Sequence, residues 1–487
     1  MEQEEKNQTS AEQTAEVAAD TSPSDRGNLN PMGYKKVARL MLAMGIPMIL
    51  SMVVQALYNV VDTMFVTMIE DAEVPNFGAV VGTNALSLAF PVQMLMIAIG
   101  VGLGVGVNAM LSRALGEGQK EKAAAIAGNA LFIIAVVYVL FLLFGFFGVK
   151  PYLALQADSS DPNYGRLIEE ASSYLTICCT MSFGALGYMI YEKFLQGTGK
   201  SVLCMIGQVS GAALNIVLDA VFVLVFKWGV AGAAWATVIG QIVSLILDAV
   251  FHYAKNKEID GGLRYLKPRK DAVAGIFKIG LPAVVMQALM PVMVFAVNVI
   301  LANTGMGNSC VTAYGDYYKV QQFIFFAAFG LNNAIIPIIS FNYGMKDRQR
   351  VKDGVRYGTI YTVAVMAIGI ALFEALAAPV SNLLSGGDQA INGYLVTAMR
   401  IIPAGFLFVG YNIAYQGILQ ALGCGVKSLI LSCLRLIVVC LPLVYLFALA
   451  PSRGFLVWWA FPIAEAVAAI AAFAFGVSAN RKIINAI

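Results

Sequence analysis

The chain has 487 residues, of which 59% are hydrophobic and only 13% are charged. A soluble protein usually carries about 25% charged residues, and a soluble fold could not hide this much apolar surface. The formal net charge of +3 is too small to attract a polyanion. The composition therefore predicts a membrane protein and argues against a secreted, a cytosolic or a nucleic-acid-binding one.

The first 36 residues form a polar, acidic segment that is rich in Glu, Gln, Ser and Thr. No apolar stretch follows an N-terminal positive charge, so the segment does not have the pattern of a signal peptide. Its low hydrophobicity is typical of disorder. We interpret residues 1–36 as a disordered cytoplasmic tail.

The rest of the chain contains repeated apolar runs, and a membrane helix needs about 20 such residues. These runs predict an all-α polytopic membrane protein with twelve spans. The predicted spans are residues 37–69, 79–112, 122–147, 167–192, 201–226, 229–254, 272–304, 309–341, 352–379, 391–419, 426–449 and 454–478.

The basic residues in the connections orient these spans, because Lys and Arg concentrate on the cytoplasmic side. With the N-terminus inside, 17 basic residues fall in cytoplasmic connections and 4 in external ones. Both termini are therefore predicted to be cytoplasmic. The most basic connection, residues 255–271, separates an N-terminal six-helix lobe (37–254) from a C-terminal one (272–487).

The two predicted lobes resemble each other in sequence. Gly45-Ile46-Pro47 in the first span matches Gly280-Leu281-Pro282 in the seventh. Six helices per repeat return the chain to its starting side, so the repeats are parallel and related by an axis along the membrane normal. The two prolines are expected to kink their helices.

Ionisable groups inside a membrane cost free energy, so each is a functional candidate. At 1.5 Å per residue, Asp62 lies about 33 Å along the first span and Asp219 about 27 Å along the fifth, both in the outer half. Asn215 lies one turn before Asp219 on the same face, and Thr237 has a similar depth in the sixth span. A buried carboxyl group beside another carboxylate favours its neutral form. This set could bind a proton, and its oxygen atoms suit Na⁺ equally well; the alternative is that Asp62 is interfacial and Asp219 caps polar structure.

The second lobe carries charges of both signs, which favours internal ion pairs over contacts with a substrate. Asp316 and Lys319 lie three residues apart on one helix. Arg400 and Glu465 have similar depths and could meet. The sequence assigns no role to Glu374.

Two features at the cytoplasmic half of the first lobe have structural interpretations. Glu192-Lys193 lies at the end of the fourth span and is interpreted as an interfacial ion pair. Glycine recurs at every second position from Gly100 to Gly106, which predicts close helix packing, with a bending helix as the alternative.

A set of short motifs follows in a fixed order between residues 34 and 480. They are Gln55-Ala56-Leu57-Tyr58-Asn59-Val60-Val61-Asp62-Thr63, Glu192-Lys193-Phe194-Leu195-Gln196-Gly197-Thr198-Gly199, Asn215-Ile216-Val217-Leu218-Asp219, Gly229-Val230-Ala231-Gly232-Ala233-Ala234-Trp235-Ala236-Thr237 and Pro337-Ile338-Ile339-Ser340-Phe341-Asn342-Tyr343-Gly344. No single motif is diagnostic, but the ordered set is specific. It resembles the multidrug and toxic compound extrusion (MATE) family.

This resemblance implies two six-helix lobes around a central cavity, alternating access, and export of amphiphilic organic cations in exchange for H⁺ or Na⁺. The family's ion-coupling residues fall on Asp62, Asn215, Asp219 and Thr237. We expect a monomer in the cytoplasmic membrane, with no catalytic residue, no nucleic-acid partner and no cofactor besides the transported ion.

The substrate cavity is expected to include residues from both lobes. The family's cavity glutamine falls on Gln55, and Tyr58 and Asn59 lie beside it in the motif. Met286 and Met290, at helical spacing in the seventh span, could line an adaptable cavity. For the methionines, core packing is the alternative.

The chain departs from the NorM-like branch of the family, which has acidic cation ligands in helices 7 and 10. Met290-Pro291 and Tyr415-Gln416 occupy those regions here. This departure favours a DinF-like or MepA-like branch that uses the first lobe for ion coupling.

Other functions fit the sequence less well. A flippase for lipid-linked oligosaccharide has a related architecture, but only Arg400, Arg435 and Lys319 are available to hold a pyrophosphate. A membrane zinc protease needs two histidines in HExxH, and the chain has one histidine. A prenyltransferase needs an aspartate cluster, which the sequence lacks. A gated channel stays open as an alternative.

Overall fold

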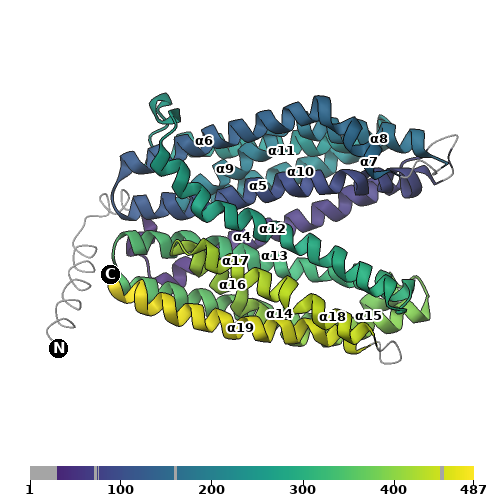
Figure 1. Ribbon diagram of the computed structural model, residues 1–487. Coiled ribbons are helices and arrows are strands. Elements are labelled where there is room, and N and C mark those ends of the chain that lie inside the picture. Colours follow the sequence, from purple (N-terminus) through teal and green to yellow (C-terminus); the bar gives the residue numbers. More distant parts are fainter. Residues whose placement is uncertain (1–29, 71–73, 75, 158–161, 450–454) are drawn as a thin grey trace.

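The computed structural model describes residues 30–70, 74, 76–157, 162–449 and 455–487. These residues form helices and contain no strand. Figure 1 shows two helical bundles side by side, with α4 (Val37–Thr67) and α12 (Lys270–Asn303) passing between them. The predicted all-α fold is confirmed.

The first bundle is built from the helices that follow α4. They are η1 (Gly78–Gly82), α5 (Thr83–Gly116), α6 (Lys120–Leu143), η2 (Phe144–Gly148), α7 (Val149–Gln156), α8 (Tyr164–Thr180), α9 (Phe183–Gly197), α10 (Ser201–Asp219), η3 (Ala220–Val225) and α11 (Gly229–Lys255). A short helix, η4 (Leu263–Leu266), lies in the connection to α12.

The second bundle is built from the helices that follow α12. They are α13 (Asn308–Gly344), α14 (Arg348–Leu384), α15 (Gln389–Ile401), η5 (Ile402–Gly405), α16 (Phe406–Ala421), α17 (Gly425–Cys433), η6 (Leu434–Val438), α18 (Cys440–Ala448), α19 (Leu456–Lys482) and η8 (Ile484–Ala486). Each bundle has its own buried apolar core, as expected of two lobes.

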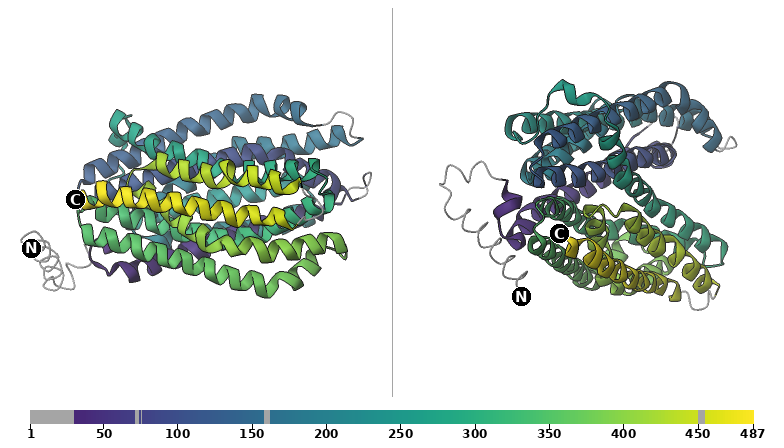
Figure 2. Two further views of the ribbon diagram at one scale, coloured as in Figure 1. Left: turned by 60° about the horizontal axis from the view of Figure 1, so that its bottom comes forward. Right: turned by 60° about the vertical axis from the view of Figure 1, so that its left-hand side comes forward.

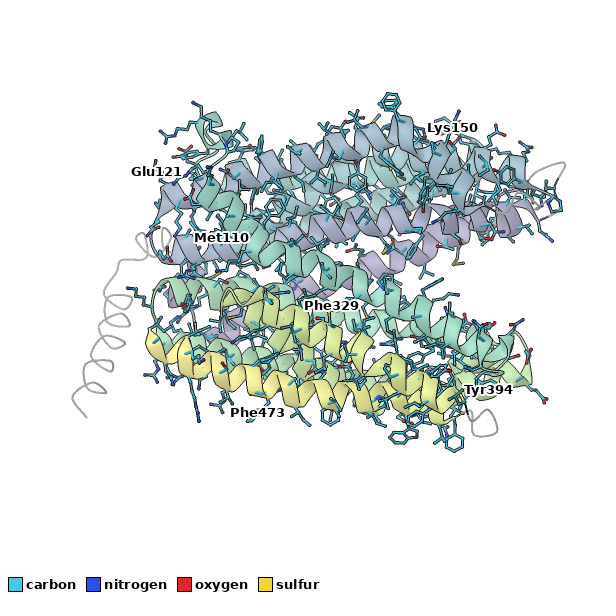
Figure 3. The ribbon with its side chains drawn as sticks, viewed as in Figure 1. Met110, Glu121, Lys150, Phe329, Tyr394 and Phe473 are labelled. Carbon is cyan, nitrogen blue, oxygen red and sulfur yellow. The ribbon has the colours of Figure 1, made fainter. Side chains whose placement is uncertain are left out.

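In the described part of the chain, 11 helices are long and apolar enough to cross a membrane, and the pair α8–α9, bent by 43°, makes a twelfth span. The predicted fourth span corresponds to this bent pair. Large apolar side chains cover the outside of both bundles, where lipid replaces water; Phe473 on α19 is 62% exposed and points away from its bundle (Figure 3). The twelve predicted spans are confirmed.

The predicted tail ends earlier than expected. Asn30 caps a short helix, α3 (Pro31–Tyr34), and Met32 is completely buried. The carbonyl oxygen of Met32 accepts hydrogen bonds from Asn342 on α13 and from Arg350 at the start of α14. The boundary at residue 36 is therefore corrected to the region before Asn30, and residues 1–29 lie outside the described residues.

One contact between the bundles depends on glycines of α5. A Cβ atom at Gly102 would lie 2.6 Å from the Cα atom of Val284 on α12, and one at Gly106 would lie 3.0 Å from the nitrogen of Gly280. Real side chains do not fit such gaps, so the two backbones can touch only because these residues are glycines. The predicted close helix packing is confirmed.

The other face of α5 packs inside the first bundle. A Cβ atom at Gly104 would lie 2.9 Å from the Cγ atom of Lys193 on α9, and one at Gly100 would overlap Met189. The alternating glycines therefore serve two partners: α9 on one face and α12 on the other.

A second contact joins α4 to α13 of the second bundle. A Cβ atom at Gly330 would lie 2.7 Å from the Cα atom of Ile49. At the end of α5, the Arg113 guanidinium lies 4.5 Å from the ring centre of Tyr343. These contacts lie toward the end that holds α3 and the C-terminus. Figure 1 shows the bundles closest together at this end, and Figure 2 shows them diverging from it.

We predict that Gly102→Val destabilises the protein. The added side chain would have to push α5 and α12 apart, and overpacking of this kind costs about 1–3 kcal/mol. Thermal unfolding in detergent measures the loss. Gly315→Val is the matched control, because Gly315 lies inside α13 and a Cβ atom there would have no neighbouring atom within 4 Å. Equal stability of the two variants would contradict the glycine contact.

Candidate functional site

The structure brings the predicted ion-coupling residues together in the first lobe. Asp62 lies on α4, Asn215 and Asp219 on the last turns of α10, and Thr237 on α11. Asn215 Nδ2 donates a hydrogen bond to Thr237 Oγ1 at 3.4 Å. Asp62 and Asp219 lie close enough for their charges to influence each other, and Tyr58, one turn before Asp62 on α4, lies near both.

The oxygen atoms of this group are short of partners. Asp219 is completely buried and Asn215 is 3% exposed, while Asp62 is partly buried. Among the described residues, Asp62 Oδ1, Asn215 Oδ1 and both carboxylate oxygens of Asp219 accept no hydrogen bond. Buried acceptors without a donor are costly. The arrangement therefore suits a bound proton or a small cation.

A small pocket lined mainly by polar residues, which we call the polar pocket, lies beside this group between α4, α9, α10 and α11. Its polar lining includes Gln55, Tyr58, Gln208, Asn215, Thr237 and Gln241. Gln55 and Tyr58, predicted for the substrate cavity, thus share a pocket with two predicted ion-coupling residues.

The other predicted cavity residues lie outside this pocket. Met290 lines a second pocket, inside the second lobe, together with aromatic side chains. Met286 and Asn59 line neither of these two pockets. Met286 contacts Gln420 of α16, and Asn59 is exposed.

The second pocket contains a buried ion pair that sequence reasoning assigned wrongly. Arg435 Nε lies 2.9 Å from Glu465 Oε1, and Asn412 Nδ2 donates to Glu465 Oε2 at 2.7 Å. Arg400 is exposed, so the predicted meeting of Arg400 with Glu465 is wrong. Similar depth in the membrane does not fix which way each helix face turns.

The other second-lobe charges are simpler. Lys319 Nζ lies 3.1 Å from Asp316 Oδ1, which confirms the predicted pair. Glu374 on α14 is exposed. Neither feature contacts the polar pocket of the first lobe.

Comparisons with known proteins identify the family. The sequence profile of the MatE family matches residues 47–221 and 282–446. The chain belongs to the MATE family.

Among curated relatives, the multidrug export protein MepA of Staphylococcus saprophyticus is 25% identical over 435 residues, which is 89% of this chain and 92% of that protein. MepA of Staphylococcus aureus (strain bovine RF122 / ET3-1) is 26% identical over 442 residues, covering 90% of this chain and 92% of the relative. The chain thus spans nearly the whole length of these MATE relatives.

Solved MATE structures share the fold. A MATE protein in complex with MaL6 matches with a TM-score of 0.84 and 25% identity, covering 92% of this chain and 97% of the other. An outward-facing multidrug resistance MATE transporter matches with a TM-score of 0.84 and 26% identity, covering 92% and 96%. The protein is therefore a polytopic membrane transporter of the MATE multidrug efflux family with the two-lobe fold.

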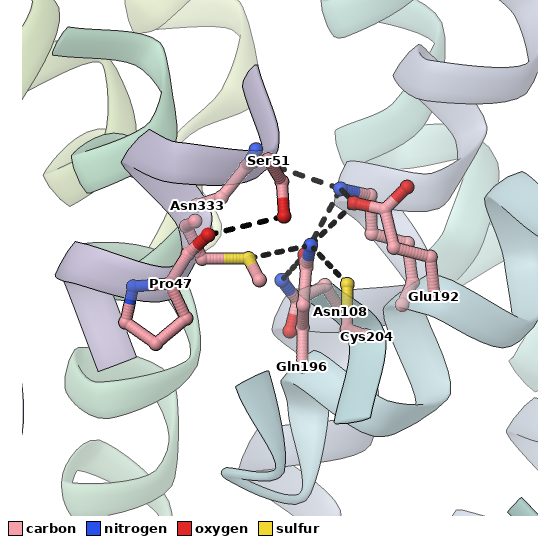
Figure 4. A network of polar contacts seen from close by, with 9 residues as sticks. Pro47, Ser51, Asn108, Glu192, Gln196, Cys204 and Asn333 are labelled. Atoms are coloured by element: carbon pink, nitrogen blue, oxygen red, sulfur yellow. Dashed lines mark hydrogen bonds and ion pairs between the residues drawn. The ribbon is translucent and has the colours of Figure 1, made fainter. Parts of the chain in front are cut away.

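In this MATE protein the pair Glu192–Lys193 is buried rather than interfacial. The Lys193 side chain is 2% exposed, and its Nζ atom lies 3.1 Å from Glu192 Oε1. Lys193 also donates to Gln196 Oε1 at 2.9 Å and to Asn333 Oδ1 of α13, in the other lobe, at 3.4 Å (Figure 4). Lys193, one of the basic residues assigned to a cytoplasmic connection, is thus part of a buried polar network.

Gln196 is the centre of this network within the first lobe. Its amide donates to Glu192 and contacts Cys204 of α10 and Met48 of α4, while Asn108 of α5 donates to its oxygen (Figure 4). The sequence motif contains Glu192 and Gln196, but their burial depends on three other helices, which sequence spacing does not place.

Sequence reasoning missed Asp248 of α11. Asp248 is completely buried, and neither carboxylate oxygen accepts a hydrogen bond from the described residues. A signal is present, since Asp248 is the one charged residue between Lys227 and Lys255. The signal is weak because Asp248 follows directly after the uncharged run of residues 228–247. A charged residue at the end of such a run is equally typical of a helix end near a loop.

We predict that Lys193→Met destabilises the protein by about 3–5 kcal/mol, because Glu192 keeps a buried charge without its partner. Lys193→Met with Glu192→Gln should recover much of that loss. Thermal unfolding in detergent measures both. As a control, Lys319→Met at the exposed second-lobe pair should cost no more than about 1 kcal/mol. A single variant as stable as the double one would contradict a role for the buried charge.

Proposed function

We propose that this MATE protein is a secondary antiporter that exports amphiphilic organic cations in exchange for H⁺ or Na⁺. The exchange site is the group Asp62, Asn215, Asp219 and Thr237. The observation that carries the proposal is the set of buried oxygen atoms without partners on two interacting carboxylates. Binding of either a proton or a cation stabilises such a group.

The geometry supports competition between the ion and the substrate. When both carboxylates are ionised, the adjoining pocket carries negative charge and attracts an organic cation. When a proton or Na⁺ neutralises the site, that attraction is lost. A ligand changes an equilibrium only through its different affinity for two states, and here the difference in charge supplies it. Gln55, Tyr58 and the neighbouring amides add polar contacts for an amphiphilic substrate.

The arrangement of the lobes supports alternating access. The lobes meet at the end that holds α3 and the C-terminus and diverge at the other end. The excess of basic residues in the connections on the side of the termini supports a cytoplasmic location for both termini. With that orientation, divergence at the other end corresponds to an outward-facing state, and we propose that the protein works as a monomer in the cytoplasmic membrane.

The relatives support the substrate class. The MepA relatives are called multidrug export proteins, and their lengths match this chain. Tyrosine rings and amide groups beside a negative charge are side chains that suit an amphiphilic cation.

A flippase for lipid-linked oligosaccharide is disfavoured by the second lobe. Its pyrophosphate would need free basic side chains in a cavity. Arg435 is held by Glu465, Lys319 by Asp316, and Arg400 lines neither of the two pockets. These three residues were the available basic candidates.

We predict that Asp62→Asn and Asp219→Asn each slow gradient-driven efflux by roughly 5- to 150-fold, the usual range of a coupling free energy. The amide keeps the shape of the carboxyl group and removes the ionisable oxygen. Transport of a fluorescent organic cation in proteoliposomes measures the effect. Asp316→Asn, the same chemical change at a second-lobe carboxyl group, is the control and should transport normally. Full efflux by both site variants would exclude this site.

We further predict that one imposed gradient suffices for transport. Proteoliposomes loaded with the fluorescent cation receive either a pH gradient without Na⁺ or a Na⁺ gradient at equal pH. Coupling to a single ion gives efflux under one gradient and none under the other. A current under voltage without substrate would instead show a channel, and would contradict the antiport.

A further inference from the structure

Asp248 is a buried acid that the exchange site does not use. It lies on α11, eleven residues after Thr237, which places it about 16 Å further along the helix toward the end that holds the termini. Its side chain is completely buried, and both carboxylate oxygens lack a donor among the described residues. A buried, unpaired carboxylate is very costly, so this group needs a proton or a cation.

Asp248 lies one helical turn beyond Ser244, which lines the polar pocket. The Ser244 hydroxyl donates to the Gly207 carbonyl at 3.1 Å. A Cβ atom at Gly207 would collide with Asp248 Oδ1, and one at Gly211 would collide with Ser244 Oγ. The glycines of α10 therefore make room for a short polar column, Ser244 and Asp248, which begins at the polar pocket.

Several titratable groups lie near Asp248. On α9 they are Tyr188 and Glu192, and on α10 it is Cys204. On its own helix, His252 lies one turn later, and its Nδ1 is 3.2 Å from the amide nitrogen of Asn256.

None of these groups supplies Asp248 with a counter-charge. Glu192 is paired with Lys193 and contacted by the Gln196 amide, so Lys193 is already neutralised. The carboxylate of Glu192 repels a second negative charge nearby. Asp248 is therefore the carboxyl group of this region whose charge no described residue compensates.

We propose that Asp248 is an inner proton-binding site, which exchanges protons with the Asp62–Asp219 group through the polar pocket. This inference rests on the proposed antiport. It identifies Asp248 as the residue that receives the proton between the exchange site and the side of the membrane on which the termini lie. In the transfer, the O–H bond of the protonated outer carboxyl group breaks as its proton passes to water entering the pocket. An O–H bond forms at Asp248 as water at the inner end gives up a proton. Water is regenerated, and no electron moves.

A proton fits this position better than a metal ion. A proton needs one oxygen atom, whereas a hard metal cation takes several oxygen ligands at short distance. No group of three His, Cys, Asp or Glu side chains able to hold a metal ion occurs in the part of the chain that the structure describes.

Infrared difference spectroscopy of the full-length protein in proteoliposomes tests the binding step directly. A protonated carboxyl group has its own C=O stretching band, and a pH change reveals it. Asp248→Asn should remove one such band that wild type shows. Asp316→Asn should leave this band unchanged. An Asp248→Asn spectrum identical to that of wild type would overturn the proposal.

Transport tests whether the bound proton belongs to the exchange. Asp248→Asn should slow proton-driven efflux by about tenfold or more, while its affinity for the fluorescent cation, measured by direct binding, changes less than about twofold. Loss of the band with full proton-driven efflux would overturn the proposed exchange. Slow efflux with an unchanged spectrum would assign Asp248 a structural role and would overturn it as well.

Gly207→Ala is a second variant that tests the proposal if Asp248→Asn fails to fold. The added methyl group displaces the Asp248 carboxyl group without removing it, so the band should remain but shift in frequency, and efflux should slow. An unshifted band would overturn the proposed location of the proton. The antiport itself has a separate readout: if Asp62→Asn and Asp219→Asn abolish efflux while Asp248→Asn does not, the inner site fails and the exchange site stands.

Discussion

The structure depends on the direct contact between the backbones of α5 and α12. Lipid tails are as apolar as leucine side chains, so membrane helices associate mainly through close packing, which small residues permit. Gly102 and Gly106 permit it here. The same helix, α5, presents Gly100 and Gly104 to α9 and thereby holds the buried network of the first lobe against the contact between lobes. Closure at one end and divergence at the other follow from this arrangement.

The lobes are similar in fold but differ in how they treat buried charge. The second lobe neutralises its own: Glu465 has Arg435 and Asn412 as partners. The first lobe leaves Asp219 and Asp248 completely buried without hydrogen bonds from the described residues. Because a membrane interior offers no water to such groups, these carboxyl groups need a proton or a cation as partner. The two halves thus share a fold, while their buried charges differ in whether protein groups compensate them.

The sequence predicted what depends on length and depth. The thickness of the membrane fixes the length of a span, so uncharged runs located the helices, and residue counts along α4 and α10 placed Asp62 and Asp219 at one level. The rotation of each helix about its axis could not be predicted from residue counts. Glu465 was matched with Arg400 by depth, whereas its partner is Arg435 on a neighbouring helix. The burial of Lys193 was missed for a similar reason, because it depends on how closely α5 and α13 approach the Lys193 side chain on α9.

The two buried ion pairs also bear on how the lobes can move. Glu192–Lys193 lies within the first lobe and Arg435–Glu465 within the second. Separation of the lobes at the closed end would break the bond from Lys193 to Asn333, a neutral amide, at 3.4 Å. Lys193 would keep Glu192 and Gln196. Since losing one partner of a buried pair is far more costly than losing one neutral hydrogen bond, charge pairing inside each lobe lets the lobes separate without leaving a charge unpaired.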